Sequence, residues 1–201
     1  MVSAARPTAL ATRIGQAGVI AAAAKVFARL GFEGTRVEDI LEEAGVARRT
    51  FYKQFSSKED VLAAVYDLAT GELLKAMRAV RSDEPLIAMR HGLDLYLDYH
   101  VENAPLLRVL VEQALLSGSP LAAARRRFRE DLIKILDGAV TASTGESHDP
   151  MLYAALISAL EGTSLDLFAT DVSAPLVARV ARAKDVMHLL LERALASAAR
   201  R

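Results

Sequence analysis

The fold of this chain is decided by residues 35–59, which read TRVEDILEEAGVARRTFYKQFSSKE. Over 37–44 the apolar residues recur at three- and four-residue spacing, which predicts a short amphipathic helix. Gly45 follows directly, and after two more residues a second short helix is predicted over 48–55. Residues 36–55 therefore form a predicted motif of helix, tight glycine turn and helix.

Residues that satisfy the free backbone groups of helix ends flank this motif. Thr35 is predicted to cap its first helix, with Glu38 three residues later as the partner in a capping box. A helix over 15–30 precedes the motif, and Gly31 is predicted to end it because glycine adopts the left-handed conformation of helix caps at little cost. Ser57 or the residue before it is predicted to cap the helix that follows.

The predicted helix over 48–55 has two different faces. Phe51 and Phe55 are four residues apart, so they can anchor one face in a core. No acidic residue occurs in this helix, and its opposite face offers Arg48, Arg49, Lys53 and Gln54. A basic surface of this kind suits insertion into the major groove of DNA.

Composition and charge fit a helical protein with a polyanionic partner. The chain has 201 residues, of which 52% are hydrophobic, and it contains neither Cys nor Trp. The absence of Cys excludes disulfides and thiolate metal sites. Residues 1–58 carry nine Lys or Arg against five Asp or Glu, a net charge of +4, whereas 59–201 carry sixteen against twenty, a net charge of −4. The basic end is therefore the candidate for binding nucleic acid.

A set of residues in this region resembles, in order and spacing, the DNA-binding domain of the TetR family. The residues that carry the resemblance are Val26-Phe27, Gly31-Phe32, Thr35, Asp39-Ile40, Ala44-Gly45-Val46, Thr50-Phe51-Tyr52, Phe55 and Ser57-Lys58-Glu59. Ala47 stands where the family often has Ser, Leu41 where it often has Ala, and Gln54 where it often has His. These departures affect individual contacts and leave the motif intact.

The resemblance implies a role for each matching position. Thr35, Tyr52 and Lys58 are expected to meet phosphates, while Arg48, Arg49 and Lys53 are the candidates for reading bases. The alternative is that the arginines are merely solvated and Tyr52 is a core aromatic. The full set of expected DNA-binding residues is Thr35, Arg36, Arg48, Arg49, Thr50, Tyr52, Lys53, Gln54 and Lys58.

The expected fold class is all-α, with an N-terminal three-helix domain and a larger C-terminal helical domain. A flexible arm is expected over 1–14, the helix-turn-helix DNA-binding domain over 15–62, and a ligand-binding and dimerisation domain over 63–201. The resemblance implies this last assignment, which no motif in the sequence supports. About nine helices are predicted, over 15–30, 37–44, 48–55, 57–80, 84–102, 104–117, 120–141, 149–170 and 174–199.

The two last helices are the candidates for a homodimer interface. The helix over 149–170 is apolar or small all round except for Glu161 and Asp166, and the helix over 174–199 carries an apolar stripe suited to a helical seam. The alternative is that both pack only within their own subunit. The expected interface residues are Leu152, Leu156, Ala159, Gly162, Leu176, Val180, Ala183, Met187 and Leu190.

Four polar residues on otherwise apolar helices are the candidates for a ligand site: Tyr96, His100, Gln113 and Tyr153. If they converge, the inducer is a small, mainly hydrophobic molecule with a polar group. The alternative for each is an ordinary core or surface position. A second set on one face, His91, Asp94 and Asp98, is expected to be solvated rather than to bind a metal.

The sequence thus predicts a cytoplasmic transcriptional regulator that binds a palindromic DNA operator as a dimer and is released by a ligand. An activator of the same fold is an alternative, since promoter geometry decides the sign, and a helical adaptor that does not bind DNA is a second. No cofactor, metal or membrane insertion is expected. An enzyme is not expected either, since residues beyond about 60 carry none of the common catalytic motifs.

Overall fold

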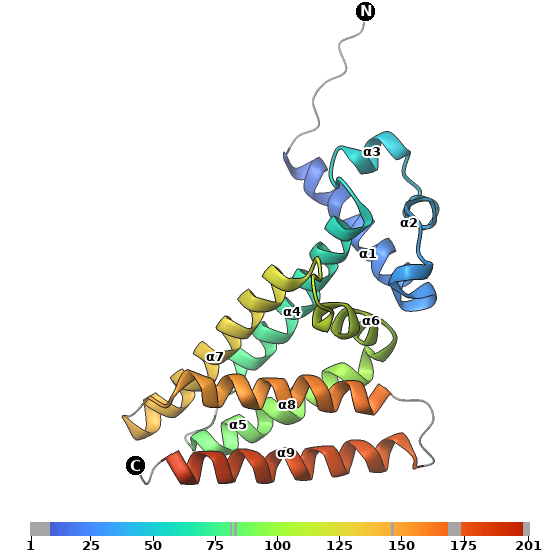
Figure 1. Ribbon diagram of the computed structural model, residues 1–201. Helices are drawn as coiled ribbons and strands as arrows, with labels where there is room; N and C mark the ends of the chain where they lie inside the picture. Colours follow the sequence, from blue (N-terminus) through green and yellow to red (C-terminus); the bar gives the residue numbers. More distant parts are fainter. Residues whose placement is uncertain (1–8, 81, 83, 146, 169–173, 199–201) are drawn as a thin grey trace, which may run out of the picture.

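The computed structural model describes residues 9–80, 82, 84–145, 147–168 and 174–198, and these residues form nine helices joined by short loops (Figure 1). This confirms the predicted all-α fold, and most helix ends lie within a few residues of the predicted ones. The helices are α1 Ala9–Gly34, α2 Val37–Ala44, α3 Arg48–Tyr52, α4 Lys58–Ala79, α5 Pro85–Glu102, α6 Ala104–Leu115, α7 Ala122–Thr144, α8 Pro150–Phe168 and α9 Leu176–Ala198.

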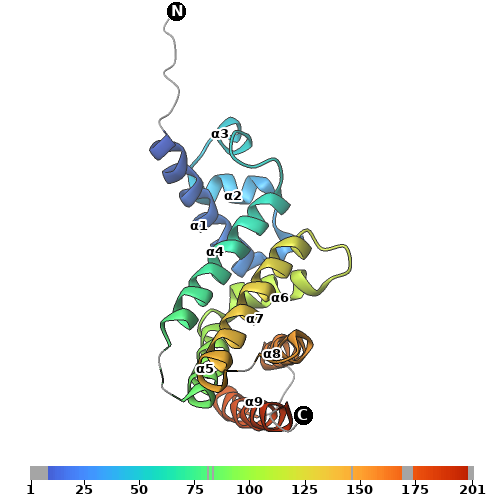
Figure 2. The same cartoon turned by 90° about the vertical axis from the view of Figure 1, so that its left-hand side faces the viewer.

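Helices α1 to α3 and the start of α4 form a small head at one end of the molecule, and α8 and α9 lie at the other end (Figures 1 and 2). The head has an aromatic and aliphatic core, because the apolar positions of its helices face one another. Its largest fully buried side chains are Phe27, Ile40 and Phe51.

Helix α1 differs from its prediction at its start and keeps the predicted break near its end. It begins at Ala9, so residues 9–14, which we expected in the arm, are helical. Pro7 precedes this start and helix-favouring residues follow it, which explains the longer helix. At Gly31 the backbone leaves the helical conformation, with φ 71° and ψ 174°. Residues 1–8 of the expected arm lie outside the described residues.

Two predicted positions in the helix-turn-helix motif are wrong, one by a single residue and the other by three. The cap of α2 is Arg36, whose backbone N–H donates to Asp39 Oδ2 at 2.7 Å, so the predicted box of Thr35 and Glu38 is wrong. Helix α3 ends at Tyr52 rather than at Phe55. The chain turns there, although the N–H of Phe55 still donates to the carbonyl of Phe51 at 3.0 Å.

Helix α4 belongs both to the head and to the rest of the molecule. Ser57 caps it by accepting from the N–H of Asp60. The helix packs against α1 near its start and against α5 and α7 further along. The expected domain boundary between residues 62 and 63 therefore falls inside one continuous helix.

Helix α8 is the central helix of the larger part. It packs against α5, α6, α7 and α9 and buries two polar side chains, Glu161 and Ser164. By length and composition it is the one helix of the described chain that could also span a membrane. Its packing accounts for the apolar residues on its inner side, and 33% of the apolar stretch is buried within the subunit.

Two ion pairs and one contact between Asp and His join α5 to α9. Arg90 pairs with Glu192 at 3.2 Å, Asp94 approaches His188 at 3.0 Å, and Asp98 pairs with Lys184 at 2.6 Å. Successive partners are four residues apart on each helix and follow in opposite order along the chain, so α5 and α9 run antiparallel. Because Asp94 and Asp98 face these partners, they do not form a cation site with His91, and no such group occurs in the described residues.

Candidate nucleic-acid interface and buried cavities

The orientation of α3 is fixed by its aromatic residues. Phe51 is fully buried and Phe55 nearly so, with their ring centroids 5.9 Å apart. Tyr52 packs edge-on against Phe51 at 5.2 Å but stays largely exposed. The two phenylalanines hold α3 on the head, so the opposite face of this helix points outward.

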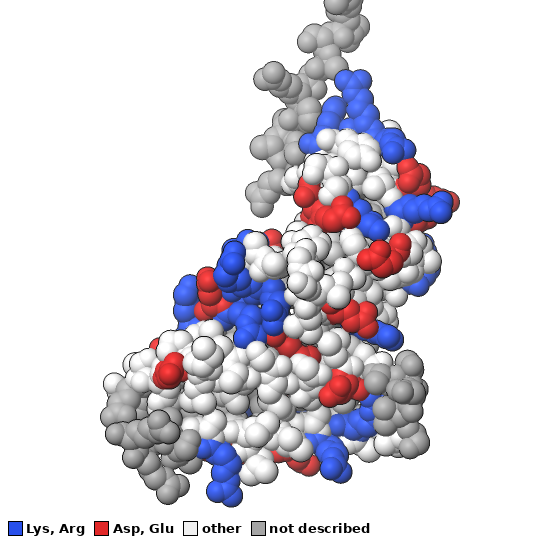
Figure 3. Space-filling view, viewed as in Figure 1, with Lys and Arg blue, Asp and Glu red and all other residues white. Residues whose placement is uncertain are grey.

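The outward face of α3 is basic, as predicted. Figure 3 shows Lys and Arg side chains gathered at the tip of the head, where α3 lies in Figure 1. We call this surface the basic tip. The exposed residues among those predicted to bind DNA are Arg36, Arg48, Arg49, Thr50, Tyr52 and Lys53.

The basic side chains of the tip differ in how they are paired. Arg48 lies 2.6 Å from Glu38 Oε1 and 5.6 Å from the ring centroid of Tyr52. The side chains of Tyr52 and Glu38 raise the pKa of Arg48 by hydrogen bonding and by charge. Arg49 and Lys53 have no ion-pair partner among the described residues. These two cations are therefore the ones most available to an incoming polyanion.

Two residues that we expected at phosphates face the protein instead. The Thr35 side chain is buried, and its hydroxyl donates to the carbonyl of Gly31 at 2.6 Å. The Lys58 ammonium donates to the carbonyls of Phe32 and Thr35 at 2.8 and 2.9 Å and lies 4.2 Å from the Phe32 ring centroid. Both side chains join the end of α1 to neighbouring elements. Gln54 is half-buried, and its Oε1 has no partner among the described residues.

The expected interface residues on α8 and α9 divide into an inward and an outward group. Met187 is only 2% exposed and packs in the core of its own subunit, so its assignment to the dimer interface is wrong. Leu156, Ala159, Val180 and Ala183 also contact that core and are partly buried.

The outward group is exposed along α8 and α9 in the described subunit. Gly162, Leu176 and Leu190 are exposed as expected, and Leu152 is half-buried. Sequence reasoning missed Val177, which is 82% exposed, and other apolar residues of the same surface. The exposed large apolar residues of the two helices are Met151, Leu176, Val177, Val186, Leu189 and Leu190. We call this set the α8–α9 apolar surface.

Two of the four expected ligand residues meet at one cavity. Tyr96 and His100 stack at 4.1 Å and line a cavity of about 30 Å³, together with Tyr66 and Glu161. Gln113 does not line it, although its neighbours on α6 do. Tyr153 lies in a separate apolar cluster, where its hydroxyl donates to Asp137 at 3.2 Å.

Burial keeps one histidine and two tyrosines of this cavity neutral. Burial lowers the pKa of His100 to about 4, so the imidazole is uncharged at neutral pH. Its Nδ1 lies 2.8 Å from the carbonyl oxygen of Tyr96. Because a carbonyl only accepts, Nδ1 carries the hydrogen and Nε2 is an acceptor. Burial also raises the pKa of both Tyr66 and Tyr96, which therefore stay protonated.

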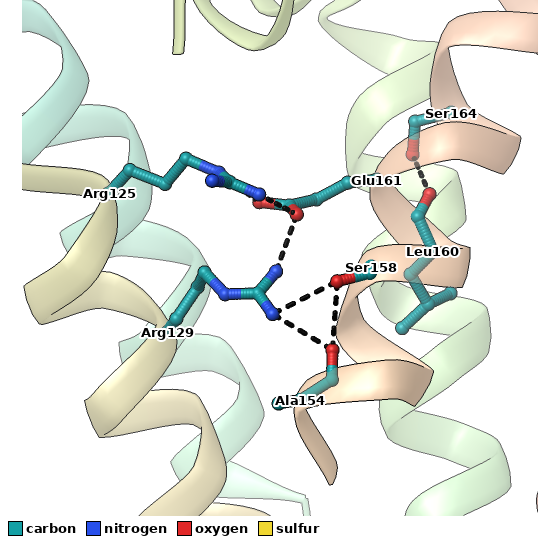
Figure 4. Close-up of polar contacts among 7 residues, drawn as sticks. All are labelled: Arg125, Arg129, Ala154, Ser158, Leu160, Glu161 and Ser164. Atoms are coloured by element: carbon teal, nitrogen blue, oxygen red, sulfur yellow. Dashed lines mark hydrogen bonds and ion pairs between the residues drawn. The ribbon is translucent and has the colours of Figure 1, made fainter. Parts of the chain in front are cut away.

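Glu161 is the acidic residue in the cavity wall, and two arginines of α7 hold it (Figure 4). Arg125 donates to both carboxylate oxygens, at 2.9 and 2.6 Å, and Arg129 donates to Oε2 at 2.6 Å. Arg129 also donates to the Ala154 carbonyl at 2.8 Å. Sequence reasoning missed this cluster, although an acid in the middle of an otherwise apolar stretch of helix was a signal of a buried partner.

The chain resembles known proteins in the sequence of its head and in its overall fold. The family described as bacterial regulatory proteins, tetR family, matches residues 19–65. The HTH-type transcriptional regulator RutR of Escherichia coli strain K12 is 33% identical over 104 residues, which cover 51% of this chain and 49% of that protein. The matched segment thus spans about half the length of the curated relative.

Solved structures resemble the chain over most of its length. A TetR-family transcriptional regulator from Pectobacterium atrosepticum has a TM-score of 0.72 at 22% identity, covering 92% of this chain and 96% of that one. The transcriptional regulator FadR from Bacillus subtilis, solved in complex with stearoyl-CoA, has a TM-score of 0.67 at 20% identity, covering 85% and 96%. These likenesses concern the fold.

Proposed function

We propose that this chain is a transcriptional repressor of the TetR type, since residues 19–65 match that family, and that it binds a palindromic operator as a dimer. A small molecule in the cavity beside Tyr96 and His100 releases it from DNA. The protein acts on DNA in the cytoplasm and catalyses no reaction.

The basic tip is the observation that supports this proposal. Phe51 and Phe55 hold α3 so that Arg49 and Lys53 project without ion-pair partners. The major groove of DNA is wide enough for one helix, so a short helix that exposes cations fits into it. Arg48 reads a base only after it leaves Glu38, so its contribution includes breaking that pair.

The test is binding to DNA fragments from the region around the gene, measured by electrophoretic mobility shift and then by fluorescence anisotropy on the selected site. We expect Arg49→Ala to weaken binding by about 1–3 kcal/mol and to relax the preference at one position per half-site. Arg126→Ala is the matched control, because it removes an exposed arginine of α7 far from the tip. Equal binding of Arg49→Ala and Arg126→Ala, or no fragment bound by the parent protein, contradicts the proposal and favours a helical adaptor.

The α8–α9 apolar surface supports the dimer. It exposes six large apolar side chains on adjacent helices, and such patches in soluble proteins mark interaction sites. A second copy of the chain would cover this surface by twofold symmetry and would place two basic tips on two half-sites.

The cavity supports the ligand. It lies among α4, α5, α6, α7 and α8, of which α4 continues into the head. The FadR neighbour, which has a similar fold, was solved with an acyl-CoA, and a mainly apolar inducer fits the wall residues here. A ligand shifts the protein off DNA only as far as it prefers the conformation that does not bind DNA. An activator would use the same contacts with DNA and the same DNA site, and only the sign of regulation would differ.

A further inference from the structure

A second cavity lies next to the first one in the same helical bundle. It also has a volume of about 30 Å³, but its wall consists only of leucines and methionines. Met77 of α4, Met89 of α5 and Met187 of α9 are among them. We call the cavity at Tyr96 and His100 the polar chamber and this one the apolar chamber.

The two chambers follow each other along the bundle in the same order on every shared helix. On α4 the lining runs from Tyr66 in the polar chamber to Met77 in the apolar one, and on α5 from His100 to Met89. Eleven residues separate the members of each pair, which corresponds to about 16 Å along a helix. Helix α7 repeats the order, with Phe128 in the polar chamber and Leu132 in the apolar chamber four residues on.

The wall of the polar chamber offers hydrogen bonds but no unpaired charge. Glu161 is the acid in this wall, and Arg125 and Arg129 already occupy both of its oxygens. His100 and Tyr96 are buried and neutral, and the imidazole keeps Nε2 as a free acceptor. A charged group placed here would lose its hydration without gaining an opposite charge, whereas a hydroxyl or amide would find partners.

We propose that the two chambers form one site for a linear amphiphile, with an uncharged hydrogen-bonding head group beside Tyr96 and His100 and an apolar chain in the methionine-lined chamber. This inference rests on the proposed ligand-released function and specifies the ligand class. Each chamber holds little free volume, so the chain enters by displacing the side chains between them. Methionine side chains suit this role because they are unbranched and flexible.

The test uses four probes in two pairs of equal chain: 1-decanol with decylammonium, which share a decyl chain, and decanamide with decanoate, which share a nonyl chain. Each is titrated into the purified protein without DNA at pH 7.5 by isothermal calorimetry, below its micelle concentration. Equal chains bury equal apolar area, so differences within a pair report the head group. We expect the alcohol and the amide each to bind at least about tenfold more tightly than the ion of the same pair. Equal or tighter binding of decanoate or decylammonium overturns the inference, as does a lack of binding by all four.

Variants test the head-group contact. His100→Leu should reduce the affinity for 1-decanol by about tenfold, because the buried acceptor is lost. His91→Leu is the matched control, since His91 lies on the same helix but is exposed. Equal loss in both variants, or no loss in His100→Leu, contradicts the assignment of the head group.

Variants also test the chain. Met187→Phe should weaken binding of 1-decanol more than that of 1-hexanol, because the ring fills the apolar chamber. Ala181→Phe, exposed on the same helix but outside the α8–α9 apolar surface, should weaken neither. If Met187→Phe leaves 1-decanol affinity unchanged, the chain does not lie in that chamber.

The readouts separate this inference from the proposed function. Probe binding is measured without DNA, and operator binding is measured without probe. Operator binding with a failed probe series overturns the ligand class alone. A successful probe series without binding to any DNA fragment overturns the repressor and leaves the site standing.

Discussion

Lys58 joins the end of α1 to the start of α4 through its ammonium group. The two carbonyls that it contacts, those of Phe32 and Thr35, lie beside the backbone break at Gly31, where the helical hydrogen bonds end. A charged donor that satisfies two carbonyls stabilises the folded state more than a neutral one would. We infer that Lys58 acts first on the stability of the head.

Replacement of this lysine tests that role. Lys58→Met keeps most of the apolar stem and removes the ammonium, so we expect the free energy of unfolding in urea to fall by about 2 kcal/mol. Lys53→Met is the control and should leave stability unchanged, because Lys53 is exposed and has no ion-pair partner among the described residues. On DNA the order should reverse, with Lys53→Met flattening the salt dependence by about one unit per lost phosphate contact. Equal stability of both variants would show that the two carbonyls do not need the lysine.

His100 makes the stability of the protein depend on pH. Burial lowers its pKa from 6.5 to about 4, so between these values the unfolded chain binds a proton that the folded protein does not. The stabilisation that neutral His100 contributes is therefore fully present above pH 6.5, and it is lost as the pH falls toward 4. At pH 5 the loss is about 2 kcal/mol relative to pH 7.5.

The measurement is urea unfolding of the parent protein and of His100→Gln at both pH values. Glutamine keeps a hydrogen-bonding side chain without titrating, so the drop in stability between pH 7.5 and pH 5 should be smaller by about 2 kcal/mol. An identical drop in the two proteins would mean that His100 titrates in the folded state as it does in the unfolded chain.

Helices α7 and α8 are joined by a buried carboxylate with two arginines. The Glu161 side chain is 6% exposed and that of Arg129 17%, so neither charge is well hydrated. Glu161→Gln leaves two partly buried guanidinium groups without a counter-charge, and we expect it to cost about 3–5 kcal/mol. Replacing Arg125, Arg129 and Glu161 together by methionine should restore most of that stability, because no buried charge remains. A triple variant as unstable as Glu161→Gln, measured by urea unfolding, would contradict this explanation.

The helices could be predicted from the sequence because their signals are local. Apolar spacing and cap residues lie within a few positions of one another, and the break at Gly31 needs only a glycine that can adopt positive φ. The predicted cap of α2 was wrong by one residue. The Thr35 hydroxyl is buried and donates to the Gly31 carbonyl, whereas Asp39 accepts from the backbone N–H of Arg36, which is therefore the cap. Two neighbouring polar residues compete for such a position, and spacing alone does not decide between them.

The sites could be predicted only where one helix carries them. Arg48 and Arg49 lie on a short helix and Lys53 directly follows it, with aromatic anchors at Phe51 and Phe55, so their exposure follows from the sequence. Glu161 needs partners 32 and 36 residues away, which no local pattern reveals. The prediction for Met187 was wrong for a related reason. Apolar residues occur on both sides of α9, and the sequence does not show which side packs in the subunit core and which side would meet a partner.

At the scale of the whole molecule, the proposed dimer rests on the α8–α9 apolar surface. We expect Val177→Glu combined with Leu189→Glu to give monomers in sedimentation experiments and to weaken operator binding by more than about tenfold, since one head then binds alone. Leu68→Glu combined with Leu116→Glu is the control, because these residues are also apolar and exposed but lie on α4 and directly after α6. If the first pair stays dimeric with full affinity, the subunits meet elsewhere.

The continuity of α4 makes it a lever arm between the chambers and the basic tip. Its 22 residues correspond to a rod about 33 Å long, with Ser57 and the head at one end and Met77 near the other. A tilt of about 5° around the end at Met77 displaces the head by about 3 Å, and two heads moving apart in a dimer change their separation by about 6 Å. Operator half-sites one turn of DNA apart are about 34 Å from each other, so this is a mismatch of nearly a fifth of the spacing. In the proposed dimer, a tilt of α4 about its end near Met77 would therefore reach the operator as a change in the spacing of the two heads.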